Sequence, residues 1–303
     1  MNEQSLKEFK KFVREWQKQR SKAAWELICE LFIELGFNKQ NKNYFLENAS
    51  TVIEEIRWKS FKELKNREIF SLDHVFEYLF KEAKISDPKT KEIIVNFLKQ
   101  FHEHLYSLNL SLTQSRRSRT GKEFESIIEL IFSSSNIPVN NQSVIKNKDS
   151  KKLIDFISPS SVEYQIDKDK VIFISVKTTL RERWQEVIDE INRAEITKIF
   201  LITLDEKLTK NLLHTCKQLN IQLVTLKSVK EKYYFNSNEI ISIEELLNIC
   251  KNNLVYWINY DYSEKERQEI REILNKQLKK YSQLQEIKEY YLRKIKEVSE
   301  SNQ

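Results

Sequence analysis

Three charged side chains, Asp155, Lys177 and Glu190, have the types and the spacing that phosphodiester hydrolysis requires. This reaction uses a hard cation to orient an attacking water and to stabilise charge on the phosphate. Magnesium prefers oxygen ligands, commonly one or two carboxylates together with water and phosphate. The lysine can position the attacking water or neutralise developing charge. The three residues indicate magnesium-dependent cleavage, with Asp155 and Glu190 as the metal ligands.

The second carboxylate of this set is displaced along the chain. Many nucleases of this kind carry an acidic residue two positions before the lysine, where this sequence has Ser175. We expect Glu190, on the following helix, to supply the missing ligand. Glu125 is a further candidate, as a ligand or as a helper base, whereas Glu123 lies about 200 degrees away around the same helix. Each element alone is a weak signal, since a buried aspartate is more often a structural hydrogen-bond acceptor.

A charged cluster, Arg181-Glu182-Arg183, lies between the lysine and the second carboxylate. An arginine can donate two hydrogen bonds to guanine O6 and N7, and a glutamate can accept one from cytosine N4. The cluster therefore fits the reading of base edges in DNA. The alternative is a solvated start of a helix, and Trp184 fits a core position better than a base contact.

Apolar periodicity predicts the elements that position these residues. Residues 1–110 show helical spacing, with a break at Asp87-Pro88. A basic turn over residues 115–121 is expected to open a further helix, and a loop rich in Ser and Asn follows over 133–151. Alternating and β-branched runs predict strands at residues 153–157, 171–176, 198–203 and 221–226, with helices at 183–194 and 208–219 between them. This order indicates an α/β sheet covered by helices.

The tail over residues 263–298 contains neither Gly nor Pro, and Ser263 with Glu266 forms a capping box at its start. We expect one long helix there, which either packs on its own domain or forms a dimer contact.

Composition narrows the class of protein. The net charge of +6 and the pI near 8.9 are compatible with a phosphate-bearing partner but do not require one. Cys29, Cys216 and Cys250 are far apart, which argues against a cysteine zinc site or a disulfide framework. The polar start resembles no signal peptide, and no apolar run approaches the roughly 20 residues of a membrane helix. We expect a soluble intracellular protein without a membrane partner.

Three motifs carry a resemblance to a known family. Ser118-Arg119-Thr120-Gly121-Lys122, the stretch from Leu153 to Ser160, and the stretch from Val176 to Trp184 resemble the type II restriction endonucleases of the SsoII, PspGI and EcoRII C-terminal group. The likeness covers about residues 110–230. It implies a PD-(D/E)xK core, a mixed sheet flanked by helices, in a Ser-x-Lys variant whose catalytic residues are Asp155, Lys177 and Glu190. The proline that names the motif is Ile154 here, which affects entry into the strand but removes no ligand.

The resemblance further implies how DNA is bound. Such enzymes read the CC and GG blocks of a CCNGG-like palindrome, so Arg181, Glu182 and Arg183 match the reading motif, with cleavage expected 5′ of the CC block. Relatives in the SsoII and PspGI branches flip out the central bases. The residues expected to contact DNA outside the reading motif are Arg57 and Trp58 for a flipped-base pocket, Gln114 for the minor groove, and Arg116, Arg117 and Arg119 for phosphates. The alternatives are a core position for Trp58 and a solvated turn for the three arginines.

The resulting prediction is a homodimeric, magnesium-dependent restriction endonuclease acting on double-stranded DNA in a bacterial or archaeal cytoplasm. A cognate DNA methyltransferase is its expected genetic partner. We assign residues 1–110 to DNA contact, the flipped-base pocket and dimerisation, 111–262 to the nuclease core, and 263–303 to the C-terminal helix. Two alternatives stay open: a structure-selective repair or junction nuclease, and a catalytically silent, sequence-specific DNA-binding regulator.

Overall fold

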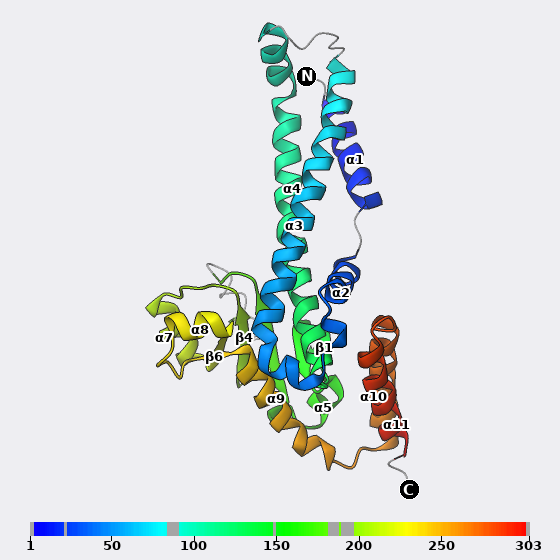
Figure 1. The fold of residues 1–303 in the computed structure, drawn as a ribbon, viewed down its shortest axis with the longest axis vertical. Coiled ribbons are helices and arrows are strands. Elements are labelled where there is room, and N and C mark those ends of the chain that lie inside the picture. The colour runs from blue at the N-terminus through cyan, green and yellow to red at the C-terminus, as the bar shows by residue number, and fades with distance from the viewer. Residues whose placement is uncertain are drawn as a thin grey trace. The chain divides into compact units, whose positions relative to one another are not determined.

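The computed structural model describes residues 3–20, 23–83, 91–147, 150–180, 188 and 197–300 (Figure 1). Helices occupy the first part of the chain, strands and helices follow each other in the middle, and helices close it. The elements in chain order are α1 (Glu3–Arg20), α2 (Ala24–Glu34), η1 (Phe37–Lys39), α3 (Lys42–Ala83), α4 (Lys91–Ser134), β1 (Asn140–Asn147), β2 (Ser150–Ser158), α5 (Ser161–Ile166), η2 (Lys168–Lys170), β3 (Ile172–Lys177), β4 (Ile199–Thr203), α7 (Lys210–Gln218), β5 (Ile221–Thr225), α8 (Lys227–Tyr233), β6 (Ile240–Ser242), α9 (Ile243–Ile258), α10 (Glu264–Lys280) and α11 (Gln285–Glu300).

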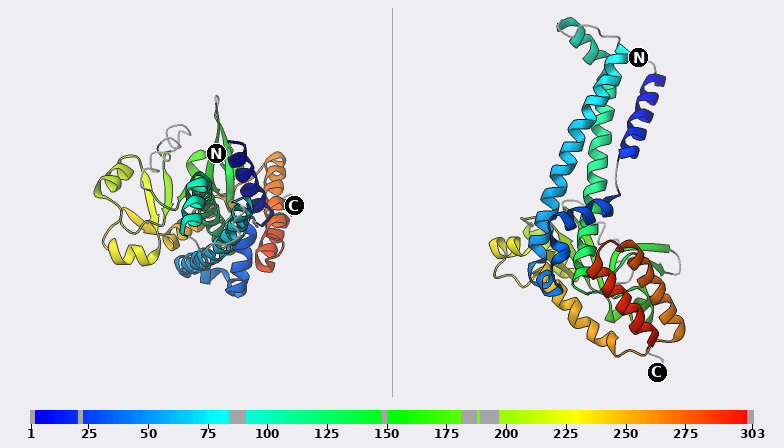
Figure 2. Two further views of the ribbon diagram at one scale, coloured as in Figure 1. Left: turned by 90° about the horizontal axis from the view of Figure 1, so that it is seen from above. Right: turned by 45° about the vertical axis from the view of Figure 1, so that its right-hand side comes forward.

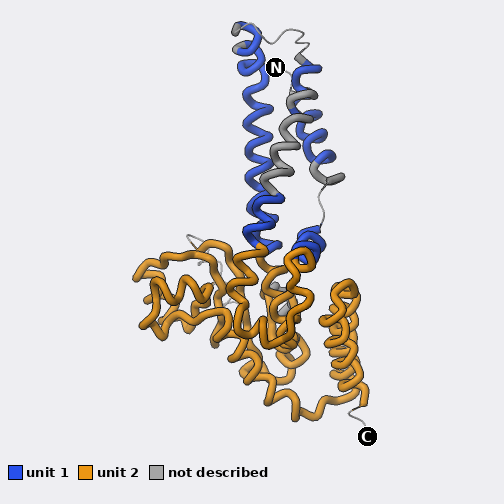
Figure 3. Tube along the Cα trace, viewed as in Figure 1, with its two compact units in different colours: residues 1–31, 57–123 blue, residues 32–56, 124–303 orange. Residues whose placement is uncertain are grey.

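The chain divides into two compact units (Figure 3). Unit 1 comprises residues 1–31 and 57–123, and unit 2 comprises 32–56 and 124–303. The helices α2, α3 and α4 each contribute to both units, because each of the three boundaries falls inside one of them. The sheet and the C-terminal helices belong to unit 2. The functions assigned to the three sequence segments stay predictions.

Unit 1 is helical and has its own apolar cluster. Phe9 and Val13 of α1 pack with Val75 and Leu79 of α3 and with three residues of α4, which are Phe97, Phe101 and Leu108. The helical spacing of these side chains places them on one face of each helix. The prediction of a helical region over residues 1–110 is confirmed for the described residues. The break at Asp87-Pro88 lies outside them.

Unit 2 is built on one mixed six-stranded sheet with the strand order β1-β2-β3-β4-β5-β6. The β1–β2 and β2–β3 pairs are antiparallel, and the β3–β4, β4–β5 and β5–β6 pairs are parallel. Strands β3 and β4 are buried along their whole length, as expected for strands covered on both faces. The predicted strands at 153–157, 171–176, 198–203 and 221–226 correspond to β2, β3, β4 and β5. The predicted helix at 208–219 corresponds to α7, and the one at 183–194 lies outside the described residues apart from Ile188.

The C-terminal tail is two helices rather than the one that we expected. α10 and α11 lie side by side in both views of Figure 2. The capping box is present, with Ser263 and Glu266 bonded reciprocally. The chain then turns at Tyr281–Leu284, whose two named side chains are both buried, so each helix can bury its own apolar stripe in unit 2. The α10–α11 pair is joined to α4 by an ion pair, in which Lys280 Nζ is 2.7 Å from Glu129 Oε2.

Two predicted loops are also wrong. The basic segment 115–121 is not a turn but the interior of α4, because arginine is a good helix former and Arg119 pairs with Glu123 one turn later. The expected loop at 133–151 contains β1, which pairs with β2 from Asn140 opposite Ile157 to Asn147 opposite Ser150. Among the described helices, none combines the length and the apolar character that crossing a membrane requires.

Candidate active site

Asp155 and Lys177 face each other across two neighbouring strands. Strand β2 is antiparallel to β3, with Phe156 opposite Ile174, so Asp155 lies beside the end of β3. Lys177 is the last residue of β3, and its Nζ is 3.3 Å from Asp155 Oδ2. The expectation that these strands are antiparallel neighbours is confirmed. The sheet thereby joins two residues that are 22 positions apart in sequence.

The Asp155 carboxylate is held in place by β3 itself. The backbone amide of Val176 donates to Asp155 Oδ2 at 2.7 Å, and the Ser175 hydroxyl donates to the same oxygen at 3.2 Å. Hydrogen bonds from two donors of the same strand fix the orientation of the carboxylate. Ser175 is fully buried, and its hydroxyl positions the aspartate. The sequence analysis treated Ser175 only as a position where a metal ligand is absent. The sequence signal for its positioning role was a hydroxyl two residues before the lysine.

This arrangement fits a hard divalent cation. All hydrogen bonds and ion pairs of Asp155 within the described part of the chain involve Oδ2, which leaves Oδ1 as a ligand atom. The Asp155 side chain is 22% exposed and can be reached by a substrate, while that of Lys177 is 9% exposed. Charges act more strongly in such a partly buried site than in water. Over the described ranges, no group of three or more His, Cys, Asp or Glu side chains could hold a metal.

The structure describes only some of the other residues predicted for this site. Glu190 lies outside the described residues, as do Arg181, Glu182, Arg183 and Trp184. Glu125 lies half-buried on the part of α4 that belongs to unit 2, and its role stays a prediction.

Glu123 belongs to unit 1, where it is buried. It accepts hydrogen bonds from Ser60 Oγ and from Arg119 Nε, each at 2.5 Å. These contacts give Glu123 a structural role, in agreement with the prediction that it points away from the position of Glu125.

A further carboxylate, which the sequence analysis missed, holds the chain just after the lysine. Asp205 Oδ2 accepts a hydrogen bond from the backbone amide of Leu180 at 2.6 Å, and Leu180 is fully buried. Asp205 follows β4, and Thr203 at the end of that strand lies opposite Lys177. The Thr203 hydroxyl in turn accepts from the Asp205 amide at 3.3 Å. Asp205 thus fixes the residue that precedes Arg181. The proximity of Asp205 to the end of β3 follows only from the parallel pairing of β3 with β4.

The predicted phosphate contacts lie on α4 in unit 1. Gln114, Arg116 and Arg117 are exposed on this helix. Arg119 differs from them, because its side chain is 15% exposed and paired with Glu123. The three arginines therefore belong to a helix rather than to a turn, and their role as phosphate contacts stays a prediction.

Trp58 is not a core residue. Its side chain on α3 is 61% exposed, and its ring stacks on that of Phe61 with 6.2 Å between centroids and 21° between planes. Phe61 is also more than half exposed, and Lys62 Nζ lies 5.1 Å from the centroid of the Trp58 ring. Arg57 precedes it on the same helix and is partly exposed. The core alternative for Trp58 is wrong, and the role of Arg57 and Trp58 in a flipped-base pocket stays a prediction.

A carboxylate inside β2 and a lysine at the end of the antiparallel neighbour β3, in a mixed sheet whose strands β3 to β6 are parallel, fit the active site of a nuclease. A model of the EcoRII C-terminal family matches residues 79–247. The type II restriction enzyme SsoII of Shigella sonnei is 35% identical over 293 residues, which cover 95% of this chain and 96% of that enzyme. The chain belongs to the type II restriction endonucleases of the group that includes SsoII, Ecl18kI, PspGI and the EcoRII C-terminal domain.

Solved structures agree with this membership. Metal-depleted Ecl18kI in complex with uncleaved DNA superposes with a TM-score of 0.88 and 35% identity, over 96% of this chain and 99% of that one. The complex of the restriction endonuclease PspGI with substrate DNA superposes with a TM-score of 0.57 and 20% identity, over 78% and 95% of the two chains. At that identity, the second likeness shows the fold alone.

Proposed function

We propose that this chain, as a homodimer with magnesium, cleaves double-stranded DNA at a CCNGG-like palindrome, just 5′ of the CC block. The observation that carries the proposal is the Asp155–Lys177 pair, at 3.3 Å across β2 and β3. The near-complete coverage of SsoII supports it, as does the likeness to Ecl18kI, whose solved complex contains uncleaved DNA. A palindromic site matches the two-fold symmetry of a dimer.

The chemistry rests on what each residue does to the scissile phosphate. Asp155, oriented by the Val176 amide, offers Oδ1 to magnesium, and Glu190 supplies the second carboxylate. The ion, when bound, lowers the pKa of a water and stabilises charge on the phosphate. Lys177, held beside Asp155 at the end of β3, orients the attacking water or neutralises the charge that develops on the phosphate. Glu125 assists as a further ligand or as a base.

Sequence reading is assigned to Arg181, Glu182 and Arg183. Each good bidentate pair contributes about 1–3 kcal/mol of discrimination between bases, and a dimer uses each pair twice. Gln114 contacts the minor groove, and Arg116 and Arg117, both exposed on α4, bind phosphates. Arg119 supports them through its pairing with Glu123. A cognate methyltransferase protects the same sites in the host.

The central bases leave the stack and rest on an aromatic surface. An extruded base requires a planar platform, and a cation near that platform adds to the attraction. Trp58 provides an exposed ring, Phe61 stacks beside it, and Arg57 is the neighbouring cation. Breaking the central pair lets a five-base-pair site be read by residues suited to four.

Digestion of a sequenced plasmid in the presence of magnesium tests the proposal. We expect discrete fragments whose mapped ends all fall 5′ of the CC block at CCNGG-like sites. Cleavage at junctions or nicks without a common sequence would replace the proposal with a structure-selective nuclease. Tight binding to one sequence without cleavage would replace it with a silent regulator.

A further inference from the structure

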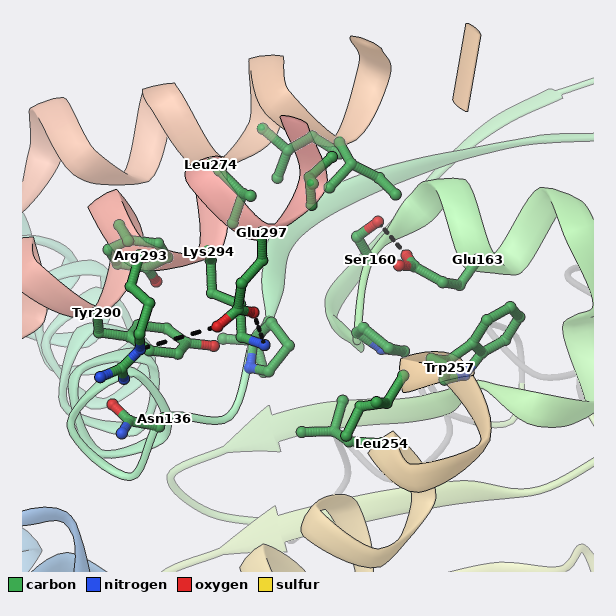
Figure 4. A pocket seen from close by; sticks show the side chains of 18 of the residues that line it. Asn136, Ser160, Glu163, Leu254, Trp257, Leu274, Tyr290, Arg293, Lys294 and Glu297 are labelled. Carbon is green, nitrogen blue, oxygen red and sulfur yellow. Dashed lines mark hydrogen bonds and ion pairs between the residues drawn. The ribbon is translucent and has the colours of Figure 1, made fainter. Parts of the chain in front are cut away.

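Unit 2 contains a cavity of about 740 Å³ that the DNA-cleaving site does not use (Figure 4). Its walls come from the second half of α9, from α10 and α11, and from the start of α5. This volume lies within the range of roughly 300–1,000 Å³ that is usual for sites of small organic ligands. All the residues that line it belong to unit 2.

The walls of the cavity are largely apolar and aromatic. Leu254, Ile258, Leu274 and Tyr290 contribute side chains from three helices. On α9, Ile258 of the lining is 72% exposed, so the described part of the chain leaves most of this apolar side chain uncovered. Covering such a surface is favourable because it removes apolar area from water. The cavity therefore favours a ligand with an apolar body.

Two buried polar atoms of the lining have no hydrogen-bond partner among the described residues. They are the Tyr290 hydroxyl, on a side chain 2% exposed, and Gln277 Oε1, on a side chain 6% exposed. In Figure 4 the Tyr290 ring extends from α11 toward the middle of the pocket. A buried polar atom without a partner is costly, and most such atoms in proteins are bonded to something. Of these two atoms, the Tyr290 hydroxyl can donate a hydrogen bond to an anionic ligand.

The charged groups around the cavity favour an anion. Lys42 and Lys251 are exposed in the lining, and the described part of the chain offers neither of them an ion pair. Arg293 and Lys294 share one carboxylate, Glu297, at 4.0 and 2.7 Å. The remaining acid of the lining is Glu163, and burial raises the pKa of this carboxyl, which favours its neutral form. The lining thus carries an excess of positive charge.

We propose that this cavity binds a small amphipathic organic anion, with an aromatic or aliphatic body and a carboxylate, sulfonate or phosphate head. The body lies against Leu254 and Leu274, and the head accepts a hydrogen bond from the Tyr290 hydroxyl, with Lys251 of the lining adding positive charge. Ser160 and Glu163, at one wall, follow directly on the strand that carries Asp155. Along the strand, Asp155 and Ser158 are about 10 Å apart, so the ligand is distinct from the scissile phosphate.

Titration of the full chain with anilinonaphthalene sulfonate, followed by calorimetry and fluorescence, tests this site. We expect one saturable site per chain, displaced by decanoate. Lys251→Glu and Ile258→Glu each place a negative charge at the opening without disturbing a buried residue, and each should weaken binding about tenfold. Lys265→Glu, an exposed charge reversal on α10 outside the lining, should leave the affinity unchanged.

Three results would overturn the proposal. One is the absence of saturable binding, and another is equal affinity in all three variants. The third is binding that appears only on dilution to the monomer, which would show that a second copy of the chain covers the cavity. DNA cleavage by the same preparations is measured in parallel, because a failure of this site leaves cleavage unaffected, whereas a failure of the proposed nuclease leaves anion binding intact.

Discussion

The backbone amide of Val176 donates a hydrogen bond to Asp155 Oδ2 at 2.7 Å. The orientation of this carboxylate is therefore set by the main chain of β3 rather than by Lys177 alone. Ser175 adds a second donor from the same strand. Removal of the lysine side chain should leave Asp155 in place, which separates the contribution of Lys177 to chemistry from any contribution to the structure of the site.

Asp205 should act on specificity through Leu180. Its carboxylate accepts from the Leu180 amide at 2.6 Å, immediately before the reading segment. Asp205→Ala removes a charge-assisted hydrogen bond of about 1.5–3 kcal/mol. We expect the ratio of cleavage at the cognate site to cleavage at sites with one altered base pair to fall about tenfold. Glu206→Ala, at an exposed neighbour, is the control. Equal losses on both substrates would limit Asp205 to a structural role.

Trp58 should contribute to DNA affinity by stacking. Trp58→Ala is expected to weaken duplex binding by about 1–3 kcal/mol, the usual contribution of one stacked base. Tyr106→Ala removes another strongly exposed aromatic of unit 1 and should have no such effect. The native chain should also bind a duplex with a mismatched central position more tightly, because less energy is then needed to unpair it. Unchanged affinity of Trp58→Ala would refute the stacking platform.

Stability should depend on pH through His104. This side chain is buried between the rings of Phe9 and Phe101, and burial lowers the pKa of its imidazole. Because the folded chain protonates at a lower pH than the unfolded one, stability is complete above the unfolded pKa of about 6.5 and is lost as pH falls through the folded pKa. Urea unfolding between about pH 7.5 and about pH 5 measures this dependence.

His104→Leu should make that profile flatter, whereas His214→Leu, at an exposed position of α7, should leave it as in the native chain. The same slope in both variants would assign the pH dependence to other groups.

The two glycines of the chain should respond oppositely to alanine. Gly36 has φ +77°, which alanine adopts only with strain, so Gly36→Ala should destabilise the fold by about 1 kcal/mol. Gly121 lies inside α4, and a Cβ there meets nothing within 4 Å, so Gly121→Ala should stabilise the helix by about 1 kcal/mol. Urea unfolding measures the change in the free energy of unfolding for each variant. Changes of the same sign in both variants would contradict the helical placement of Gly121.

Local patterns predicted much of this structure. Strands β2 to β5 follow from their apolar and β-branched runs, and the pairing of Asp155 with Lys177 follows from one residue inside the first run and one residue that ends the second. β1 was missed because residues 140–147 contain Asn, Gln, Ser and Lys, which are poor indicators of a strand, and because it forms at the sheet edge by pairing with β2. The turn between α10 and α11 carries no Gly or Pro to signal it.

Tertiary contacts account for the remaining differences. Asp205 acts on a residue 25 positions earlier, and the parallel pairing of β3 with β4 brings them together. The basic segment of α4 has the residues of a loop but is held as helix by Arg119 and Glu123. The relationship between Asp205 and Leu180 is not encoded in a local spacing, whereas Arg119 and Glu123 are one helical turn apart. The exposed position of Trp58, against the general preference of tryptophan for the core, is likewise a property of the folded chain.

The most direct test of this account measures binding and cleavage together, on one duplex with a single CCNGG-like site, for the native chain and for Lys177→Ala. Lys168→Ala, at an exposed position of η2, is the control. We predict that Lys177→Ala binds the duplex with native affinity but cleaves it about 10²–10⁴-fold more slowly, the usual effect of losing one catalytic group. Cleavage at the native rate by Lys177→Ala would contradict the assignment of this site.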